Sequence, residues 1–173
     1  MKHIILTLIL LTTIHAQEVI NGHILPPEPD PAVNNATLLG VDVNDNGVRD
    51  DVERWIYKTY KDKHPIHIDI AMQGAKTKQI MLKDPTKAKK IHNIMVAPIL
   101  CESYYKVCID TPIIKKGKRI NSKSFRKIIF NTKERMDAYL QYDDLLSGDS
   151  YRVPWCSERK QLCDFNTSKY DQK

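Results

Sequence analysis

After its first sixteen residues, the chain lacks any apolar run long enough to cross a bilayer, which takes about 20 residues. The first sixteen residues differ from the rest. Met1-Lys2-His3 is a short basic start, residues 4–14 form an apolar run broken only by threonines, and Ala16 suits a cleavage site. The pattern predicts a secretory signal peptide over residues 1–16 and a mature chain with no transmembrane segment, with a retained N-terminal anchor as the alternative.

The chain also lacks the short motifs that mark common catalytic sites. It has no G-x-S-x-G, no H-E-x-x-H, no phosphate loop and no dinucleotide fingerprint. Asp143 and Asp144 are adjacent, and adjacent side chains on a helix point apart. His64 and His67 suit a solvated loop better than a metal site. We therefore expect a protein that is not an enzyme, with a hydrolase acting on an anionic envelope polymer as one alternative and an inhibitor of a secreted enzyme as another.

Cysteine is scarce, and its spacing is regular. The four cysteines form two C-x6-C pairs, and an even number in an exported chain predicts two disulfides and a periplasmic or secreted location. Zinc ligands are usually spaced more tightly. If both segments are helical, the two Cα atoms of each pair lie about 10.5 Å apart, beyond the reach of a bridge, so the segments must be joined to each other. The cysteines are Cys101, Cys108, Cys156 and Cys163.

Two connectivities then remain. An antiparallel arrangement pairs Cys101 with Cys163 and Cys108 with Cys156, whereas a parallel arrangement pairs Cys101 with Cys156 and Cys108 with Cys163. One helix between the two segments slightly favours the parallel arrangement. Local bridges become possible again if either segment is a loop.

Positive charge is concentrated in one stretch that contains no acid. The whole chain carries a formal charge of +6, which becomes +5 once Lys2 is removed with the signal peptide. Such a run usually forms a solvated face, and the alternative is contact with an anionic envelope polymer, a lipid surface or another envelope protein. Phe125 is its single aromatic residue, which argues against stacking on nucleic acid. The basic patch consists of Lys115, Lys116, Lys118, Arg119, Lys123, Arg126 and Lys127.

One stretch carries a strong chemical signature. Residues 42–53 match the calcium-loop pattern D-x-[DN]-x-[DN]-G-x5-E, with Gly47 at the sharp turn. Ca²⁺ takes six to eight oxygen ligands, and a twelve-residue loop offers them from positions 1, 3, 5, 7, 9 and 12. A metal-free turn at Asn46-Gly47 is the alternative, although such a turn needs no carboxylates at positions 9 and 12. The predicted ligands are Asp42, Asn44, Asn46, the Val48 carbonyl, Asp50 and Glu53.

The loop resembles an EF-hand loop, but no long helix enters it, no second loop accompanies it, and Arg49 occupies position 8. Val48 and Asp50 make it more similar to the solitary loops of thrombospondin type 3 repeats and dockerin-like modules. That resemblance covers residues 42–53 and implies extracellular, structural calcium. This chain departs from it in lacking repeats and in ending the loop with Glu53. The whole arrangement also resembles bacterial exported proteins with one such loop ahead of a helical region, which implies no activity.

The apolar spacing predicts a mainly α fold. We expect helices over residues 50–61 and 65–83, a third beginning at Asp84-Pro85 and kinked or divided at Pro98, and a fourth capped by Asn131. In the fourth, Met136, Tyr139 and Leu140 are expected to face inward, and Gly148 to end it. Prolines over residues 26–31 predict an extended tether over residues 17–36, with no helix.

The expected organisation is therefore a signal peptide (1–16), a proline-rich tether (17–36) and a calcium loop with a small disulfide-stapled helical domain (37–173). The expected function is that of an exported protein that binds one Ca²⁺ structurally and acts as a binding or scaffold module in the cell envelope. Few ligand charges and a solitary loop suggest a dissociation constant of about 10⁻⁵ to 10⁻³ M.

Overall fold

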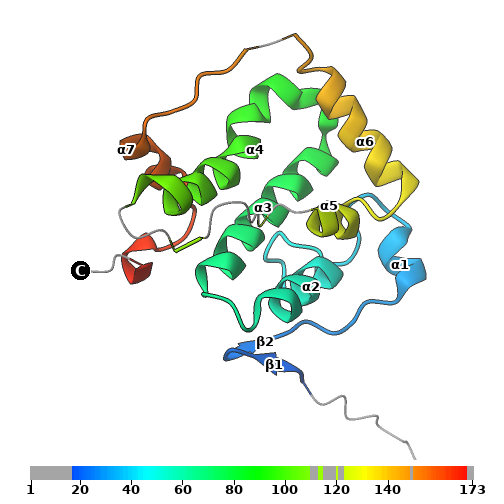
Figure 1. The fold of residues 1–173 in the computed structure, drawn as a ribbon. Helices are drawn as coiled ribbons and strands as arrows, with labels where there is room; N and C mark the ends of the chain where they lie inside the picture. The colour runs from blue at the N-terminus through cyan, green and yellow to red at the C-terminus, as the bar shows by residue number, and fades with distance from the viewer. Residues whose placement is uncertain (1–16, 110–112, 115–119, 121–122, 149, 171–173) are drawn as a thin grey trace, which may run out of the picture.

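The computed structural model describes residues 17–109, 113–114, 120, 123–148 and 150–170, and the description below concerns these residues. The chain is mainly helical and carries two disulfides in a small domain (Figure 1). Within these residues, no helix combines the length and the apolar character that crossing a membrane requires. The main helices are α2 (Asp50–Tyr60), α3 (Ile66–Lys83), α4 (Ala88–Ser103), α5 (Lys123–Ile129), α6 (Lys133–Asp144) and α7 (Cys156–Arg159).

Shorter elements join and flank these helices. The N-terminal part holds a hairpin of β1 (Val19–Ile20) and β2 (His23–Ile24), followed by the one-turn helix α1 (Pro31–Asn35). The connections and the C-terminal part hold the 3-10 turns η1 (Pro85–Lys87), η3 (Lys160–Leu162) and η4 (Thr167–Tyr170) and the π-helical turn η2 (Tyr104–Cys108).

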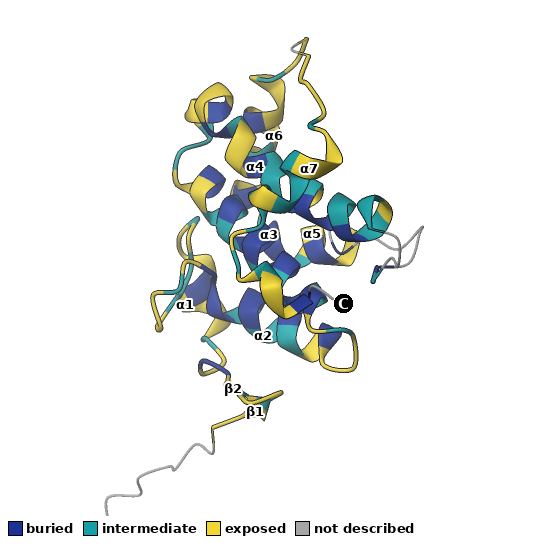
Figure 2. Ribbon diagram, turned by 90° about the vertical axis from the view of Figure 1, so that its left-hand side faces the viewer, coloured by how far each residue is buried: buried dark blue, intermediate teal, exposed yellow. Residues whose placement is uncertain are grey.

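Helix α3 lies at the centre of the domain and packs against α2, α4 and α6. A helix that is apolar on most sides belongs in a core. Ten of the eighteen residues of α3 are buried, and Figure 2 shows the helix in the middle of the domain. The buried side chain of Gln73 donates to the Leu162 carbonyl at 2.6 Å and so ties α3 to η3. The buried residues of α3 are Ile66, Ile68, Ile70, Ala71, Gln73, Gly74, Ala75, Thr77, Met81 and Leu82.

The first two helices are confirmed within one residue at each end, because their apolar spacing is long and regular. The third begins later than predicted. Residues 85–87 form a 3-10 turn, and the α-helix starts at Ala88. Asp84 precedes the 3-10 turn, and its carboxylate accepts a hydrogen bond from the Thr86 hydroxyl at 2.5 Å. The helix then continues through Pro98 without being divided.

The N-terminal segment is more structured than an extended tether. Asn21 (φ 52°) and Gly22 (φ 79°) form the turn of the β1–β2 hairpin, and this dipeptide favours such a turn because both residues accept a positive φ. Pro31 opens α1, and the Asp30 carboxylate caps it by accepting from the N–H groups of Ala32 and Val33. The prediction that the prolines forbid a helix was wrong here, since proline at the first helical position removes no hydrogen bond.

Helix α6 exists as predicted, but its cap and inner face differ. Thr132, not Asn131, caps it, with the hydroxyl accepting from the Arg135 N–H at 3.3 Å. Met136 and Leu140, predicted to face inward, are 37% and 49% exposed. The buried side chains are Arg135, Ala138 and Tyr142. Tyr139 is partly buried, and its ring stacks on that of Phe130.

The two disulfides join the end of α4 and the following turn η2 to the C-terminal segment in the antiparallel arrangement. Cys101 pairs with Cys163 and Cys108 with Cys156, with Cα atoms 5.1 and 5.5 Å apart. Figure 1 shows α7 lying beside the last turns of α4. The slight preference for a parallel pairing was wrong, because it counted one intervening helix, whereas α5 and α6 both lie between the paired segments.

Candidate metal centre

The predicted calcium loop turns tightly around the Asp42 carboxylate. This carboxylate accepts hydrogen bonds from the N–H groups of Asn46 at 3.2 Å and Gly47 at 2.9 Å. Asp45 (φ 51°) and Gly47 (φ 80°) take positive φ values, which glycine adopts freely. The loop therefore has a compact, hydrogen-bonded form, and its chain returns so that the Asp50 N–H bonds the Val41 carbonyl at 2.8 Å.

Glu53, at position 12 of the loop, is fully buried although it lies in the first turn of α2. Its Oε2 accepts from the side-chain amides of Asn44 at 3.2 Å and Asn46 at 2.6 Å, and its Oε1 lies 2.5 Å from Nε2 of His23. No lysine or arginine of the described residues pairs with it. A buried carboxylate without a full counter-charge is costly, so this position favours a cation.

The structure brings three predicted ligands together, because the side chains of Asn44 and Asn46 both contact the Glu53 carboxylate. Asp42 is linked to this group through the backbone N–H of Asn46. The two amides present nitrogen to Glu53, and Asn46 Oδ1 accepts from the Val48 N–H at 2.8 Å. To ligate a cation, both amides would turn so that oxygen replaces nitrogen, which needs rotation of one side-chain bond in each.

Asp50, at position 9, is buried and points back across the loop. Its carboxylate accepts from the Val43 N–H at 3.2 Å. Burial raises the pKa of Asp50 to about 6; the Val43 hydrogen bond opposes this rise, and the negative charges of Asp42, Glu53 and Asp51 add to it. Several carboxylates thus repel one another in a small volume, and a bound cation would relieve that repulsion.

The donor chemistry fits Ca²⁺, since carboxylate, amide and backbone oxygens are the ligands this cation prefers. The carboxylates alone are too few, so a complete set of calcium ligands would also need the side-chain oxygens of Asn44 and Asn46 and the Val48 carbonyl. Among the described residues, no group of three or more His, Cys, Asp and Glu side chains is placed so that it could hold a metal ion. The Val48 side chain itself belongs to the core and is 0% exposed, so only its backbone is offered to the loop.

Arg49, which departs from the EF-hand pattern, anchors the loop to the helical domain. It is buried, pairs with Asp51 at 2.5 Å, and donates to the carbonyls of Ile128 at 2.7 Å and Ile129 at 3.2 Å. The loop is thereby fixed against the end of α5, about eighty residues away in the chain. Arg49 thus has a structural role in attaching the loop to the helical domain.

A second buried arginine holds the segment that leads into the loop. Arg135 of α6 donates to the carbonyls of Asn34, Leu38 and Thr37 and to the side-chain oxygens of Asn35 and Asn131. Burial, together with the nearby charge of Arg49, lowers its pKa to about 10. The five hydrogen bonds of one guanidinium thus fix α1 and the following turn against α6, just before the loop begins.

Sequence reasoning missed His23, which reaches the loop from the β1–β2 hairpin. Its ring stacks on Tyr57 with centroids 4.1 Å apart and contacts Glu53 through Nε2. The signal that could have found it is the Asn21-Gly22 dipeptide, which favours a two-residue hairpin turn between the segments Val19–Ile20 and His23–Ile24. The hairpin places His23 over the loop, and Asn21 donates to the Lys61 carbonyl at the end of α2.

The basic patch lies partly outside the described residues, which exclude Lys115, Lys116, Lys118 and Arg119. Lys123, Arg126 and Lys127 belong to α5 and are exposed. Among the histidines considered for a metal, His67 Nδ1 lies 2.9 Å from the His64 carbonyl, and His64 Nδ1 accepts from the Ile66 N–H. These bonds are local to the turn between α2 and α3.

The resemblance of the loop to solitary calcium loops rests on residues 42–53 alone. No protein-family model matches the chain, and comparison with curated proteins and with solved structures finds no match.

Proposed function

We propose that this protein binds one Ca²⁺ in the loop over residues 42–53 and uses it structurally, as an exported module without enzymatic activity. The ion would be held by the side chains of Asp42, Asn44, Asn46, Asp50 and Glu53 and by the Val48 carbonyl. It would supply the positive charge that the loop carboxylates lack. The chain's own residues would supply a rigid frame on both sides of the loop.

The observation that carries this proposal is the environment of Glu53. A carboxylate that is 0% exposed meets two neutral amides and one imidazole whose side chain is 34% exposed. Those amides belong to Asn44 and Asn46, the residues that the loop pattern assigns as ligands. A metal-free turn accounts for Asp42 and Gly47, but it gives no reason to bury a carboxylate six residues after the glycine.

A structural role follows from what the loop connects. Its C-terminal end is the first turn of α2, and Arg49 attaches it to α5. An ion bound in the loop would stabilise the start of α2 without disturbing the link to α2 or the link through Arg49 to α5. Its binding free energy would therefore appear as stability of the domain.

Export and partner binding belong to the same proposal. The two disulfides favour an oxidising compartment. Lys123 and Lys127 are exposed on α5, where they can contact an anionic envelope polymer, a lipid surface or another envelope protein.

The test is thermal unfolding and calorimetric titration of the oxidised chain, with Ca²⁺ and with chelator. With a dissociation constant of about 10⁻⁴ M, Ca²⁺ at one hundred times that concentration adds about 2.7 kcal/mol to the free energy of unfolding. For a chain of this size we expect the melting temperature to rise by about 5–10 °C. Glu53→Gln keeps the shape of the side chain and should remove most of that rise.

Asp45→Asn is the matched control. Asp45 lies in the same loop, loses the same charge and is exposed, and asparagine tolerates its positive φ. The control should keep the calcium response. A wild-type melting temperature that Ca²⁺ does not change, or equal calcium responses in Glu53→Gln and the wild type, would refute the proposal.

A further inference from the structure

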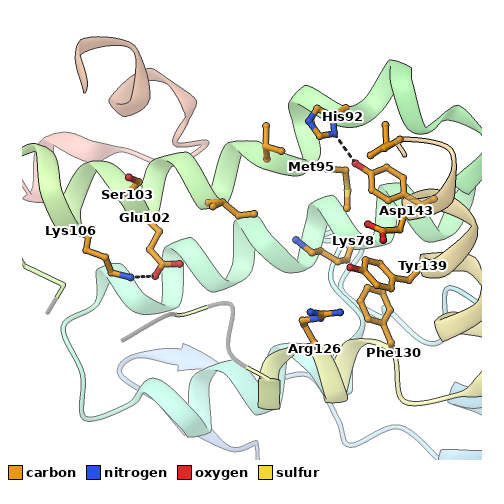
Figure 3. A pocket seen from close by; sticks show the side chains of 14 residues that line it. Lys78, His92, Met95, Glu102, Ser103, Lys106, Arg126, Phe130, Tyr139 and Asp143 are labelled. Carbon is orange, nitrogen blue, oxygen red and sulfur yellow. Dashed lines mark hydrogen bonds and ion pairs between the residues drawn. The ribbon is translucent and has the colours of Figure 1, made fainter. Parts of the chain in front are cut away.

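A pocket of about 510 Å³ lies between α4 and α6, with α3 beneath it and α5 along one side (Figure 3). None of the residues that line it belongs to the loop over residues 42–53. Its volume falls within the range of about 300–1,000 Å³ that is usual for small-molecule sites. The pocket therefore has the size of a binding site and is distinct from the candidate metal centre.

One wall of the pocket is apolar. Met95, Val96 and Ile99 line it from α4, and the rings of Phe130 and Tyr139 line the opposite side. Ile99 is 51% exposed, so part of this apolar surface meets water. Transfer of such surface from water to an apolar ligand is favourable, by about 25 cal/mol per Å².

Two cations from different helices project into the middle of the pocket. Figure 3 shows Lys78 of α3 and Arg126 of α5 pointing into the space below α4. Neither forms an ion pair with a carboxylate of the described residues. The Arg126 guanidinium lies over the Tyr139 ring, 5.1 Å from its centroid. Burial, with a further contribution from the charge of Arg126, lowers the pKa of Lys78 to about 8.

The acids that line the pocket do not neutralise these cations. Glu102 is paired with Lys106 at 2.7 Å and also accepts from the Ile120 N–H. Asp143 lies at the other end, in the part of the pocket where the Tyr142 hydroxyl contacts His92 Nδ1. A partly buried cation without an anion is costly, and Lys78 is such a cation. Arg126 is exposed and adds a second positive charge to the same pocket.

We propose that this pocket binds a small amphiphilic anion, with a carboxylate between Lys78 and Arg126 and an apolar chain along the α4 wall. A neutral apolar ligand would cover the wall and leave both cations unpaired. A small hydrophilic anion would pair with the cations and leave the wall in water. Only a ligand that carries both groups satisfies both parts of the pocket.

The probe is decanoate, measured by isothermal titration on the oxidised full chain beside decanol and acetate. Decanoate should bind one to one. A charged hydrogen bond contributes roughly 1.5–3 kcal/mol, so decanol should bind about tenfold to a hundredfold more weakly. Acetate should bind more weakly as well, because it lacks the chain that covers the α4 wall.

Lys78→Met tests the role of the charge. It keeps the length of the apolar stem and should weaken decanoate binding at least about tenfold. Lys83→Met is the control, since Lys83 is an exposed lysine of the same helix that does not line the pocket. Ile99→Asn changes a half-exposed wall residue and should also weaken binding. The proposal is overturned if decanoate fails to bind, if decanol or acetate binds equally well, or if Lys78→Met binds decanoate as the wild type does.

Discussion

The substitution Gly40→Ala tests how rigidly the two buried arginines fix the segment before the loop. Gly40 has φ +69°, a conformation that side chains with a Cβ rarely adopt. A Cβ at this position would also overlap Arg49 Cδ and lie 2.6 Å from Asn34 Oδ1 and 2.9 Å from Arg135 Nη2. All three neighbours are buried, and both guanidinium groups are held by several hydrogen bonds.

The expected cost has two parts. The left-handed backbone costs about 1–2 kcal/mol for a residue other than glycine, and crowding in a well-packed site costs about 1–3 kcal/mol more. The sum is roughly 3 kcal/mol, which lowers the melting temperature of a chain of this size by about 6–12 °C. Differential scanning calorimetry or urea unfolding in the presence of chelator measures it.

Gly22→Ala separates the two parts. Gly22 has φ +79°, and a Cβ built there meets nothing within 4 Å. This variant should lose only about 1–2 kcal/mol, because it bears the backbone cost alone. If Gly40→Ala is no less stable than Gly22→Ala, the guanidinium groups move aside easily, and the rigid frame described for the loop is wrong.

Two further outcomes follow from the structure. Lys78→Met should raise the free energy of unfolding by about 1 kcal/mol at pH 7, since it removes an unpaired, partly buried cation. This gain in stability should shrink as the pH rises above 8. Lys78 then loses its proton in the folded wild type, whereas in the unfolded chain it stays protonated up to its ordinary pKa of 10.5. A gain in stability that grows with pH would contradict this. Replacing Cys101 and Cys163 by serine should cost about 3 kcal/mol, since the remaining bridge leaves an effective loop of roughly fifteen residues to close, and urea unfolding of the oxidised variant should detect the loss; an unchanged midpoint would contradict it.

The sequence predicts well those helices whose apolar spacing is a local pattern of neighbouring residues. The predicted ends of α2 and α3 agree with the structure to within one residue, because the apolar spacing of both helices repeats over several turns. The inner face of α6 differs from the prediction because its buried residues include the charged Arg135. Its partner Asn34 lies 101 residues earlier, and no local pattern reveals that a charged residue has such partners.

The candidate sites likewise include one that the local sequence predicts and one that it does not. The loop over residues 42–53 is contiguous, so its spacing could be read directly from the sequence. His23 comes from a hairpin whose turn signal was visible but whose position over Glu53 depends on the packing against α2. The pocket around Lys78 could not be predicted, because its walls come from four helices that only the tertiary fold brings together.

The nested pairing of Cys101 with Cys163 and Cys108 with Cys156 has a consequence for proteolysis. Any single cut between residues 108 and 156 separates the chain into two pieces, and each piece carries two of the four cysteines. Both bridges then cross from one piece to the other, so the nicked molecule remains one covalent unit until it is reduced. Helices α5 and α6 lie inside this closed ring. A protease that cuts there produces a two-chain protein whose pieces separate on a gel only after reduction.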